Sequence, residues 1–120
     1  MQLEYLIFDF SDEETGSCSF DAMASVLPAR LALLLEEIGA VLGWAYREFG
    51  PPSAASDDGG WSFELQAVDG RDAALAVDCD LEGARASMAQ APEGRVTMAL
   101  TLSGPRAFGE AFAQAFPGSD

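Results

Sequence analysis

Four stretches of the chain alternate apolar with polar side chains, and this period of two leaves few architectures open. They are residues 18–26, 61–67, 73–79 and 96–102, and each is typical of a strand with one buried face. Residues 28–49 instead repeat their apolar side chains every three or four positions, which indicates one long helix with a single buried stripe. Half-buried strands with few helices favour an antiparallel sheet whose helices pack on one face.

Three further segments complete the predicted order. Residues 3–10 are apolar on both faces, which predicts a strand in the sheet interior or one covered at an interface. Residues 84–89 form a weaker, alanine-rich strand, and a short helix follows Pro105. The buried ridge of that helix is Phe108, Phe112 and Phe116. The expected fold is an α+β two-layer sandwich, with a mainly antiparallel sheet of about five to six strands in the order ββαββ(β)βα and two helices on one face.

The chain has 120 residues, the size of one ordinary domain, and is long enough to bury a core without disulfides. We therefore expect residues 1–120 to form a single domain. The clearest break is residues 50–60, a run of small residues and helix breakers that predicts a flexible loop. Within the long helix, Gly39 and Gly43 lie four positions apart, and we expect a strand to pass close to the helix there.

The side-chain inventory removes several kinds of chemistry. All six basic residues are arginine, and the chain has no histidine and no lysine. Histidine acid–base catalysis, histidine-ligated zinc and lysine Schiff bases are therefore excluded for this chain alone. We leave the question of an enzyme open but favour a non-enzymatic protein. An arginine-only composition rich in alanine and glycine is typical of a GC-rich bacterial genome.

Acidic residues outnumber basic ones by 20 to 6, which gives a net charge of −14. A chain of this charge does not neutralise phosphates, so we expect no nucleic-acid partner and no binding to an anionic membrane. No run approaches the ~20 apolar residues of a membrane helix, and the first residues lack the positive charge of a secretory signal. We therefore expect a cytoplasmic protein of bacterial type.

The polar positions of the predicted strands assign acidic side chains to the second face of the sheet. A solvated face is one interpretation, since antiparallel sheets often keep one face in water. The functional interpretation is a docking surface for a basic protein, because complementary charge speeds association and selects the partner. The candidate partner-binding residues are Asp21, Glu64, Asp72, Asp78 and Asp80. A non-enzymatic interaction module, such as an inhibitor or chaperone-like binder, is the leading hypothesis.

Amphipathic aromatic residues around the predicted loop suggest a different function. Trp44 and Tyr46 lie near the end of the long helix, and Trp61 follows the loop. With Arg47 as the cation for an anionic ligand, they would line a small-molecule pocket or the site of a minor enzyme. Packing in the core is the alternative role for these rings.

We expect neither a metal nor a cofactor. Residues 78–83 begin like a calcium loop, but Ala86 and Ala89 occupy positions where later ligands are needed. Cys18 and Cys79 fall on inward-facing positions, so we expect both to be buried thiols.

A homodimer is a third hypothesis. Residues 3–10 carry apolar side chains on both faces, and a second chain would cover whichever face the protein's own core leaves exposed. Function would then depend on assembly.

Overall fold

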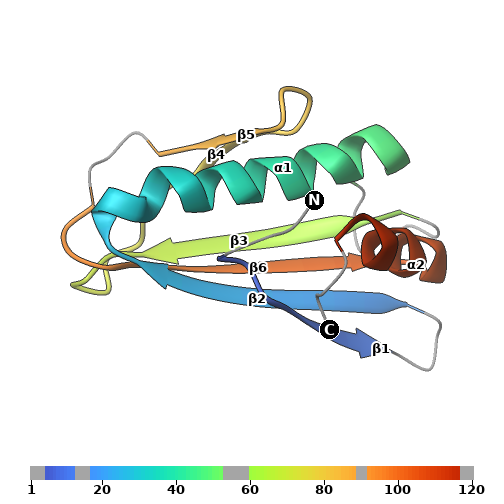
Figure 1. The fold of residues 1–120 in the computed structure, drawn as a ribbon, viewed down its shortest axis with the longest axis horizontal. Coiled ribbons are helices and arrows are strands. Elements are labelled where there is room, and N and C mark those ends of the chain that lie inside the picture. Colours follow the sequence, from blue (N-terminus) through green and yellow to red (C-terminus); the bar gives the residue numbers. More distant parts are fainter. Residues whose placement is uncertain (1–4, 13–16, 53–59, 89–91, 117–120) are drawn as a thin grey trace.

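The computed structural model describes residues 5–12, 17–52, 60–88 and 92–116. These residues form two α-helices and two antiparallel sheets, which confirms an α+β fold (Figure 1). The strands are divided between a four-stranded sheet and a separate two-stranded hairpin. The elements are β1 (Phe8–Asp12), β2 (Cys18–Val26), a 3-10 turn (Pro28–Arg30), α1 (Leu31–Phe49), β3 (Ser62–Val68), β4 (Asp78–Asp80), β5 (Arg85–Ser87), β6 (Val96–Gly104) and α2 (Arg106–Ala115).

The four-stranded sheet has the order β1-β2-β6-β3, and every neighbouring pair is antiparallel. β2 and β6 are its central strands, and every second side chain along each of them is buried. The alternation predicted for residues 18–26 and 96–102 is therefore confirmed. The buried side chains of these strands form the sheet's half of the core.

Both helices pack on the same face of the sheet (Figure 1). The stripe that α1 buries is Leu31, Leu34, Ile38, Val41, Leu42 and Ala45. α2 buries the predicted phenylalanine ridge, and the Phe112 ring lies 4.2 Å from the Phe20 ring of β2, measured between centroids. Helical spacing in the sequence thus predicted which side of each helix faces the sheet.

β1 is an edge strand, whereas residues 3–10 were expected to form an interior or covered strand. The strand begins at Phe8, and residues 1–4 lie outside the described ranges. Phe8 is fully buried because α2 covers it, with the Phe112 ring 5.0 Å away. Phe10 is 47 % exposed because no described strand lies beyond β1 to cover it.

The strand predicted over residues 73–79 does not continue the sheet. The chain reverses at Asp69, whose N–H donates to the carbonyl oxygen of Ala73 at 3.0 Å. Pairing with β3 then ends after a single bridge between Val68 and Ala74. Only the last two residues of the expected strand, Asp78 and Cys79, belong to β4, which pairs with β5 instead of with the four-stranded sheet.

The β4–β5 hairpin lies alongside α1 (Figure 1). A Cβ on Gly39 would lie 2.6 Å from the carbonyl oxygen of Ala84, and one on Gly43 would lie 2.3 Å from the Ala84 Cβ. These two glycines therefore permit the close approach that the sequence predicted, although it involves the hairpin turn and not a strand of the main sheet. The middle residue of each hairpin strand, Cys79 in β4 and Ala86 in β5, is half-buried and packs against the core.

The segment predicted as a loop is only partly described, because residues 53–59 lie outside the described ranges. Trp61, which follows them, is buried and donates its indole N–H to the carbonyl oxygen of Gly50 at 2.9 Å. This hydrogen bond joins the two ends of the segment. Among the described helices, none is long and apolar enough to cross a membrane.

Candidate functional site

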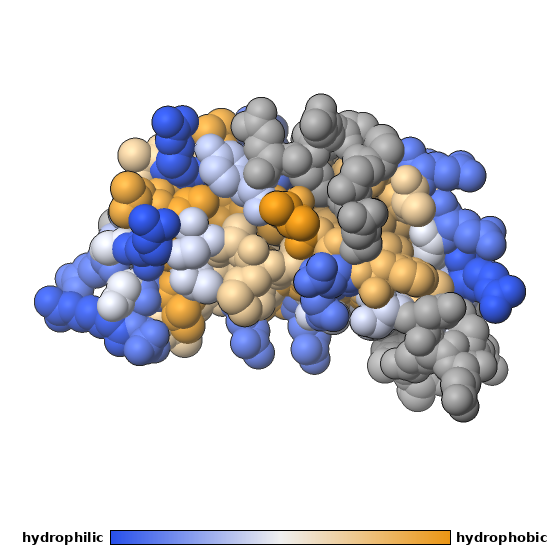
Figure 2. Space-filling view, turned by 60° about the horizontal axis from the view of Figure 1, so that its bottom comes forward, coloured by the Kyte–Doolittle hydropathy of each residue, from blue (hydrophilic) through white to orange (hydrophobic). Residues whose placement is uncertain are grey.

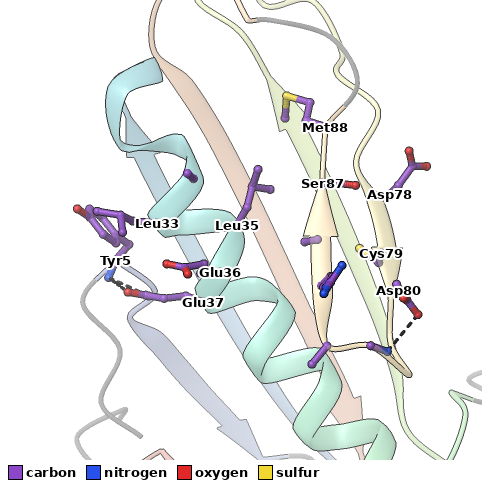
Figure 3. Close-up of a pocket in the computed structure, with 15 residues that line it drawn as sticks. Tyr5, Leu33, Leu35, Glu36, Glu37, Asp78, Cys79, Asp80, Ser87 and Met88 are labelled. Atoms are coloured by element: carbon purple, nitrogen blue, oxygen red, sulfur yellow. Dashed lines mark hydrogen bonds between the residues drawn. The ribbon is translucent and has the colours of Figure 1, made fainter.

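A groove of about 1160 Å³ runs along the first half of α1, bounded by Tyr5 on one side and the β4–β5 hairpin on the other (Figure 3). We call it the α1–hairpin groove. Much of its lining is apolar and comes from the helix and the hairpin. The apolar lining residues include Leu33, Leu35, Cys79, Ala86 and Met88.

Carboxylates outnumber cations around the α1–hairpin groove. Glu36 lies on α1, whereas Asp78 and Asp80 form the rim on β4, and all three residues are exposed. Arg85 is the one basic residue among those that line the groove. The single salt bridge in the described part of the chain lies outside the groove, so none of these four charges is neutralised by an ion pair there.

The positions of the rim carboxylates follow from the short hairpin. Along β4, Asp78 and Asp80 are exposed while Cys79 between them is half-buried. The Asp80 Oδ1 accepts a hydrogen bond from the Gly83 N–H at 3.1 Å, which closes the turn (Figure 3). A Cβ on Gly83 would lie 2.5 Å from the other carboxylate oxygen of Asp80. Glycine at this position therefore lets the turn close over the carboxylate.

Glu37 holds the N-terminal side of the groove in place. Its side chain is the one charged group in the core of the described residues, with 7 % of its surface exposed. Its carboxylate accepts hydrogen bonds from the N–H groups of Tyr5, at 3.0 and 3.1 Å, and Leu6, at 3.0 Å (Figure 3). These bonds satisfy the buried charge and fix the segment that carries Tyr5 beside α1.

Cys79 lies in the groove but is a weak candidate for a nucleophile. Burial, and to a smaller extent the neighbouring Asp78 carboxylate, raise the pKa of the Cys79 thiol above its ordinary value. The thiol is therefore protonated near neutral pH, and only the thiolate is reactive. Cys79 acts as part of the apolar lining.

The structure separates the five predicted partner-binding residues into three places. Asp78 and Asp80 line the α1–hairpin groove, on the side of the helices. Asp21 and Glu64 lie on the face of the four-stranded sheet that the helices leave uncovered, which we call the open face. Asp72 lies in the exposed turn after β3, with a left-handed φ of 61°. The expectation of one acidic sheet face was therefore wrong, because β4 belongs to a different sheet.

The two predicted residues on the open face lie in one row across three strands. Asp21 is the register partner of Thr101, and Thr101 is the partner of Glu64. The Asp21 Oδ1 accepts a hydrogen bond from the Thr101 hydroxyl at 2.7 Å. Asp9 lies directly opposite Asp21 on β1 and extends the row. Asp9 is not among the residues predicted from the sequence, although an acid that interrupts an apolar run was a signal for it.

An apolar pair lies beside this acidic row. Ile7, directly before β1, and Met23, on β2, each have a side chain that is 69 % exposed. Figure 2 views the molecule toward the β1 edge of the sheet and shows apolar surface between hydrophilic groups on that side. The open face therefore combines carboxylates with exposed apolar groups.

The tryptophans predicted to line a ligand pocket instead pack in and against the core. Trp61 is 1 % exposed, and its ring stacks on that of Phe108 at 5.9 Å. Trp44 is half-buried, with aromatic ring centroids of Phe49, Phe108, Phe112 and Phe116 within 6.0 Å. On α1, Tyr46 is half-buried and Arg47 is exposed, and neither residue lines the α1–hairpin groove. The alternative of core packing is correct for both tryptophans.

A smaller pocket of about 370 Å³ lies where β1 meets α2. It is lined by Phe10, Cys18, Arg106, Gly109, Glu110 and Ala113. A Cβ on Gly109 would lie 2.7 Å from the Cys18 Sγ, so helix and strand are in close contact there. Cys18 is buried as predicted, Cys79 is only half-buried, and the two cysteines form no disulfide.

The α1–hairpin groove could not be predicted from the sequence, because its lining comes from three separate segments. Glu37 lies directly beside the apolar stripe at Leu34 and Ile38, and this position was the available signal for a buried acid. Glu36, one position earlier, is turned toward solvent. For Tyr5 no local pattern indicated that its segment would pack beside the helix.

Among the described residues, no three histidine, cysteine, aspartate or glutamate side chains come together in a way that could hold a metal ion. Comparisons with protein-family models, with curated proteins and with solved structures found no match for this chain. Its function must therefore be inferred from the chemistry of these surfaces.

Proposed function

We propose that this protein is a non-enzymatic interaction module that binds a basic segment of another protein in the α1–hairpin groove. The observation that carries the proposal is an apolar lining surrounded by exposed carboxylates. The carboxylates are those of Glu36, Asp78 and Asp80. A lysine or arginine side chain fits such a surface, because its aliphatic stem packs on apolar groups while its charge meets a carboxylate.

The size of the groove favours a polypeptide over a small ligand. Pockets for small molecules usually have volumes of roughly 300–1,000 Å³ and bury most of the ligand. The α1–hairpin groove, at about 1160 Å³, is larger and open to solvent. The net charge of −14 adds long-range attraction for a basic partner and repels acidic competitors.

The available side chains support binding rather than catalysis. The chain has no histidine or lysine, and the raised pKa of Cys79 keeps the thiol in the groove protonated near neutral pH. The proposal includes a bacterial cytoplasmic location, which the arginine-only basic composition and the absence of a disulfide between the two cysteines support.

The open face is the second candidate surface for a basic partner. Asp9 lies directly opposite Asp21, and like charges opposite each other destabilise a strand pair. A basic partner would relieve this repulsion while its apolar groups cover Ile7 and Met23. The groove is favoured because it is concave and buries more of a bound segment than a sheet surface does.

Peptide selection tests the proposal even though the partner is unidentified. Peptides would be selected on the purified protein from a random display library, and binding of the strongest would be measured by fluorescence anisotropy. We expect selected peptides that combine lysine or arginine with apolar residues, and an affinity that falls as salt rises. The variant Asp78→Asn/Asp80→Asn should bind about tenfold more weakly. Asparagine keeps an acceptor oxygen for the Gly83 N–H, so the turn is preserved.

The matched control is Asp21→Asn/Glu64→Gln, which also removes two negative charges, but from the open face. It should change the affinity by less than about twofold, because those charges lie outside the groove and are screened. Equal weakening by both double variants would show that net charge, and not the groove, accounts for binding. Weakening by the control alone would favour the open face. Selected peptides without basic residues would overturn the proposal.

A further inference from the structure

We propose that two copies of this chain associate through the free edge of β1, so that two four-stranded sheets join into one continuous antiparallel sheet. The inference does not depend on the proposed function of the groove, which lies elsewhere on α1. It rests on the exposure of Phe10, on the pocket beside it and on the charge pattern of β1.

Among the described strands, β1 ends the four-stranded sheet, and none of them pairs with its outer backbone edge. Phe10 faces inward, with its ring 5.2 Å from the Phe20 ring, yet 47 % of its surface is exposed. Exposed strand edges are templates for pairing with another chain, and an inward-facing aromatic at such an edge lacks only a neighbouring strand to cover it. A strand added beside β1 would bury this ring.

The pocket of about 370 Å³ between β1 and α2 lies directly beside Phe10. Arg106, Gly109 and Ala113 of α2 supply one of its walls, spaced so that they share one side of the helix. A volume of this size holds one or two large side chains. Strand addition typically uses backbone hydrogen bonds for affinity and such pockets for alternate side chains.

The sequence of β1, Phe-Asp-Phe-Ser-Asp, is complementary to itself in one antiparallel register. When the pairing is centred on Phe10, Asp9 of one copy faces Ser11 of the other, and Asp12 faces Phe8. A register centred on Asp9 would oppose Asp9 to itself. A register centred on Ser11 would pair only Phe10, Ser11 and Asp12 of each copy. Only the register centred on Phe10 pairs all five residues of β1 with their inner faces aligned and opposes no two carboxylates.

This register indicates that the strand pairing with β1 comes from a second copy of the same chain. It brings the two Phe10 side chains opposite each other, with Cβ atoms about 4.5–5.5 Å apart on the shared inner face. Each ring can then cover the pocket beside the other. A twofold interface requires this kind of reciprocity, in which one patch recognises itself. The net charge of −14 on each copy opposes association, so salt should strengthen the dimer.

Sedimentation analysis tests the proposal directly. The wild-type protein should sediment at twice the 12.6 kDa mass of one chain, and the dimer fraction should rise with salt. Phe10→Arg should give a monomer. The control is Met23→Arg, which changes an apolar side chain that is more exposed, at 69 %, but lies on the open face away from the β1 edge. It should remain a dimer.

A second variant tests the register and does not depend on how well Phe10→Arg folds. Phe10→Cys should form an intermolecular disulfide on mild oxidation with diamide, and mass spectrometry should map it to position 10 on both chains. Ser25→Cys, on the open face, should not cross-link. A wild-type monomer at all concentrations and salts would overturn the proposal, and so would a dimer lost in Met23→Arg but kept in Phe10→Arg. Rising salt should strengthen the dimer but weaken the binding of basic peptides in the groove. One proposal can therefore be overturned while the other still holds.

Discussion

Glu37 places a carboxylate in the core, where its two oxygens accept hydrogen bonds from the N–H groups of Tyr5 and Leu6. Glu37→Gln replaces one of those acceptor oxygens with an amide that cannot accept. Oε1 can still accept from both N–H groups, but the new NH2 group takes the place of the oxygen 3.1 Å from the Tyr5 N–H, so two donors face each other. The hydrogen bonds also lose their charge, and we expect the free energy of unfolding to fall by about 1–3 kcal/mol. Urea unfolding should show a lower midpoint with an unchanged slope.

The exposed neighbour Glu36 provides the control for this prediction. Glu36→Gln makes the same chemical change on the same helix, but its side chain faces solvent. It should alter the free energy of unfolding by no more than about 0.5 kcal/mol. Similar losses in both variants would contradict the structural role assigned to Glu37.

Cys79 gives a prediction on pH. Because burial and the Asp78 carboxylate raise the pKa of its thiol, the thiolate forms only at a pH above the ordinary cysteine range. Alkylation of Cys79 by iodoacetamide should therefore be slow near neutral pH and accelerate at higher pH than in a model peptide. Asp78→Asn should shift this profile to lower pH. An unshifted profile would show that burial alone raises the pKa.

At the scale of elements, sequence periodicity correctly predicted the strands and helices that have one continuous buried face. β2, β6 and the two helices each bury one face along their whole length, so alternation or helical spacing identifies them. Residues 73–79 alternate equally well, yet only Asp78 and Cys79 among them belong to a strand, β4, in a separate hairpin. Alternation reports that a segment has two faces and does not report which element will cover the apolar one.

The contact of α1 with the hairpin can be tested by Gly43→Ala. Alanine favours a helix interior over glycine by about 1 kcal/mol. Here, however, the new Cβ would lie 2.3 Å from the Ala84 Cβ and 2.8 Å from its Cα. We expect the overlap to dominate and the variant to lose about 1–3 kcal/mol of stability, seen as a lower melting temperature.

Ala84→Gly provides the matching rescue. Ala84 has a left-handed φ of 55°, which glycine adopts without strain, and the change removes the nearest overlapping atom. In a double-mutant cycle, Gly43→Ala should cost less stability in the Ala84→Gly background than in the wild type. Additive effects would mean that the two residues are not in contact.

At the scale of the whole molecule, the acidic character was predictable and its distribution was not. Asp21 and Asp78 both occupy polar positions of alternating segments, but one lies on the open face and the other at the groove rim. Their separation depends on where the chain leaves the sheet after Val68. The groove also needs Tyr5, which Glu37 holds beside the helix through a contact 32 residues apart in sequence.

The excess of negative charge predicts how salt should act on the folded protein. The chain carries a net charge of −14, one salt bridge joins described residues, and Asp9 and Asp21 lie opposite each other. The native state brings these charges closer together than the unfolded chain does, so screening should stabilise it. Raising sodium chloride from about 0.05 to about 0.5 M should increase the free energy of unfolding by on the order of 1 kcal/mol, or about 4 °C in Tm.

Sucrose serves as the control solute, because it stabilises folded proteins without screening charge. Comparing unfolding in sucrose with unfolding in sodium chloride separates charge screening from a general effect of solutes. Wild-type protein in sodium chloride should gain more stability than Asp9→Asn, which has already lost one of the two opposed charges. Equal gains, or a loss of stability with salt, would show that repulsion between carboxylates does not limit the fold. The same salt should weaken binding of a basic peptide to the groove. Stability and binding should therefore change in opposite directions along one salt titration, because both depend on the same uncompensated negative charge.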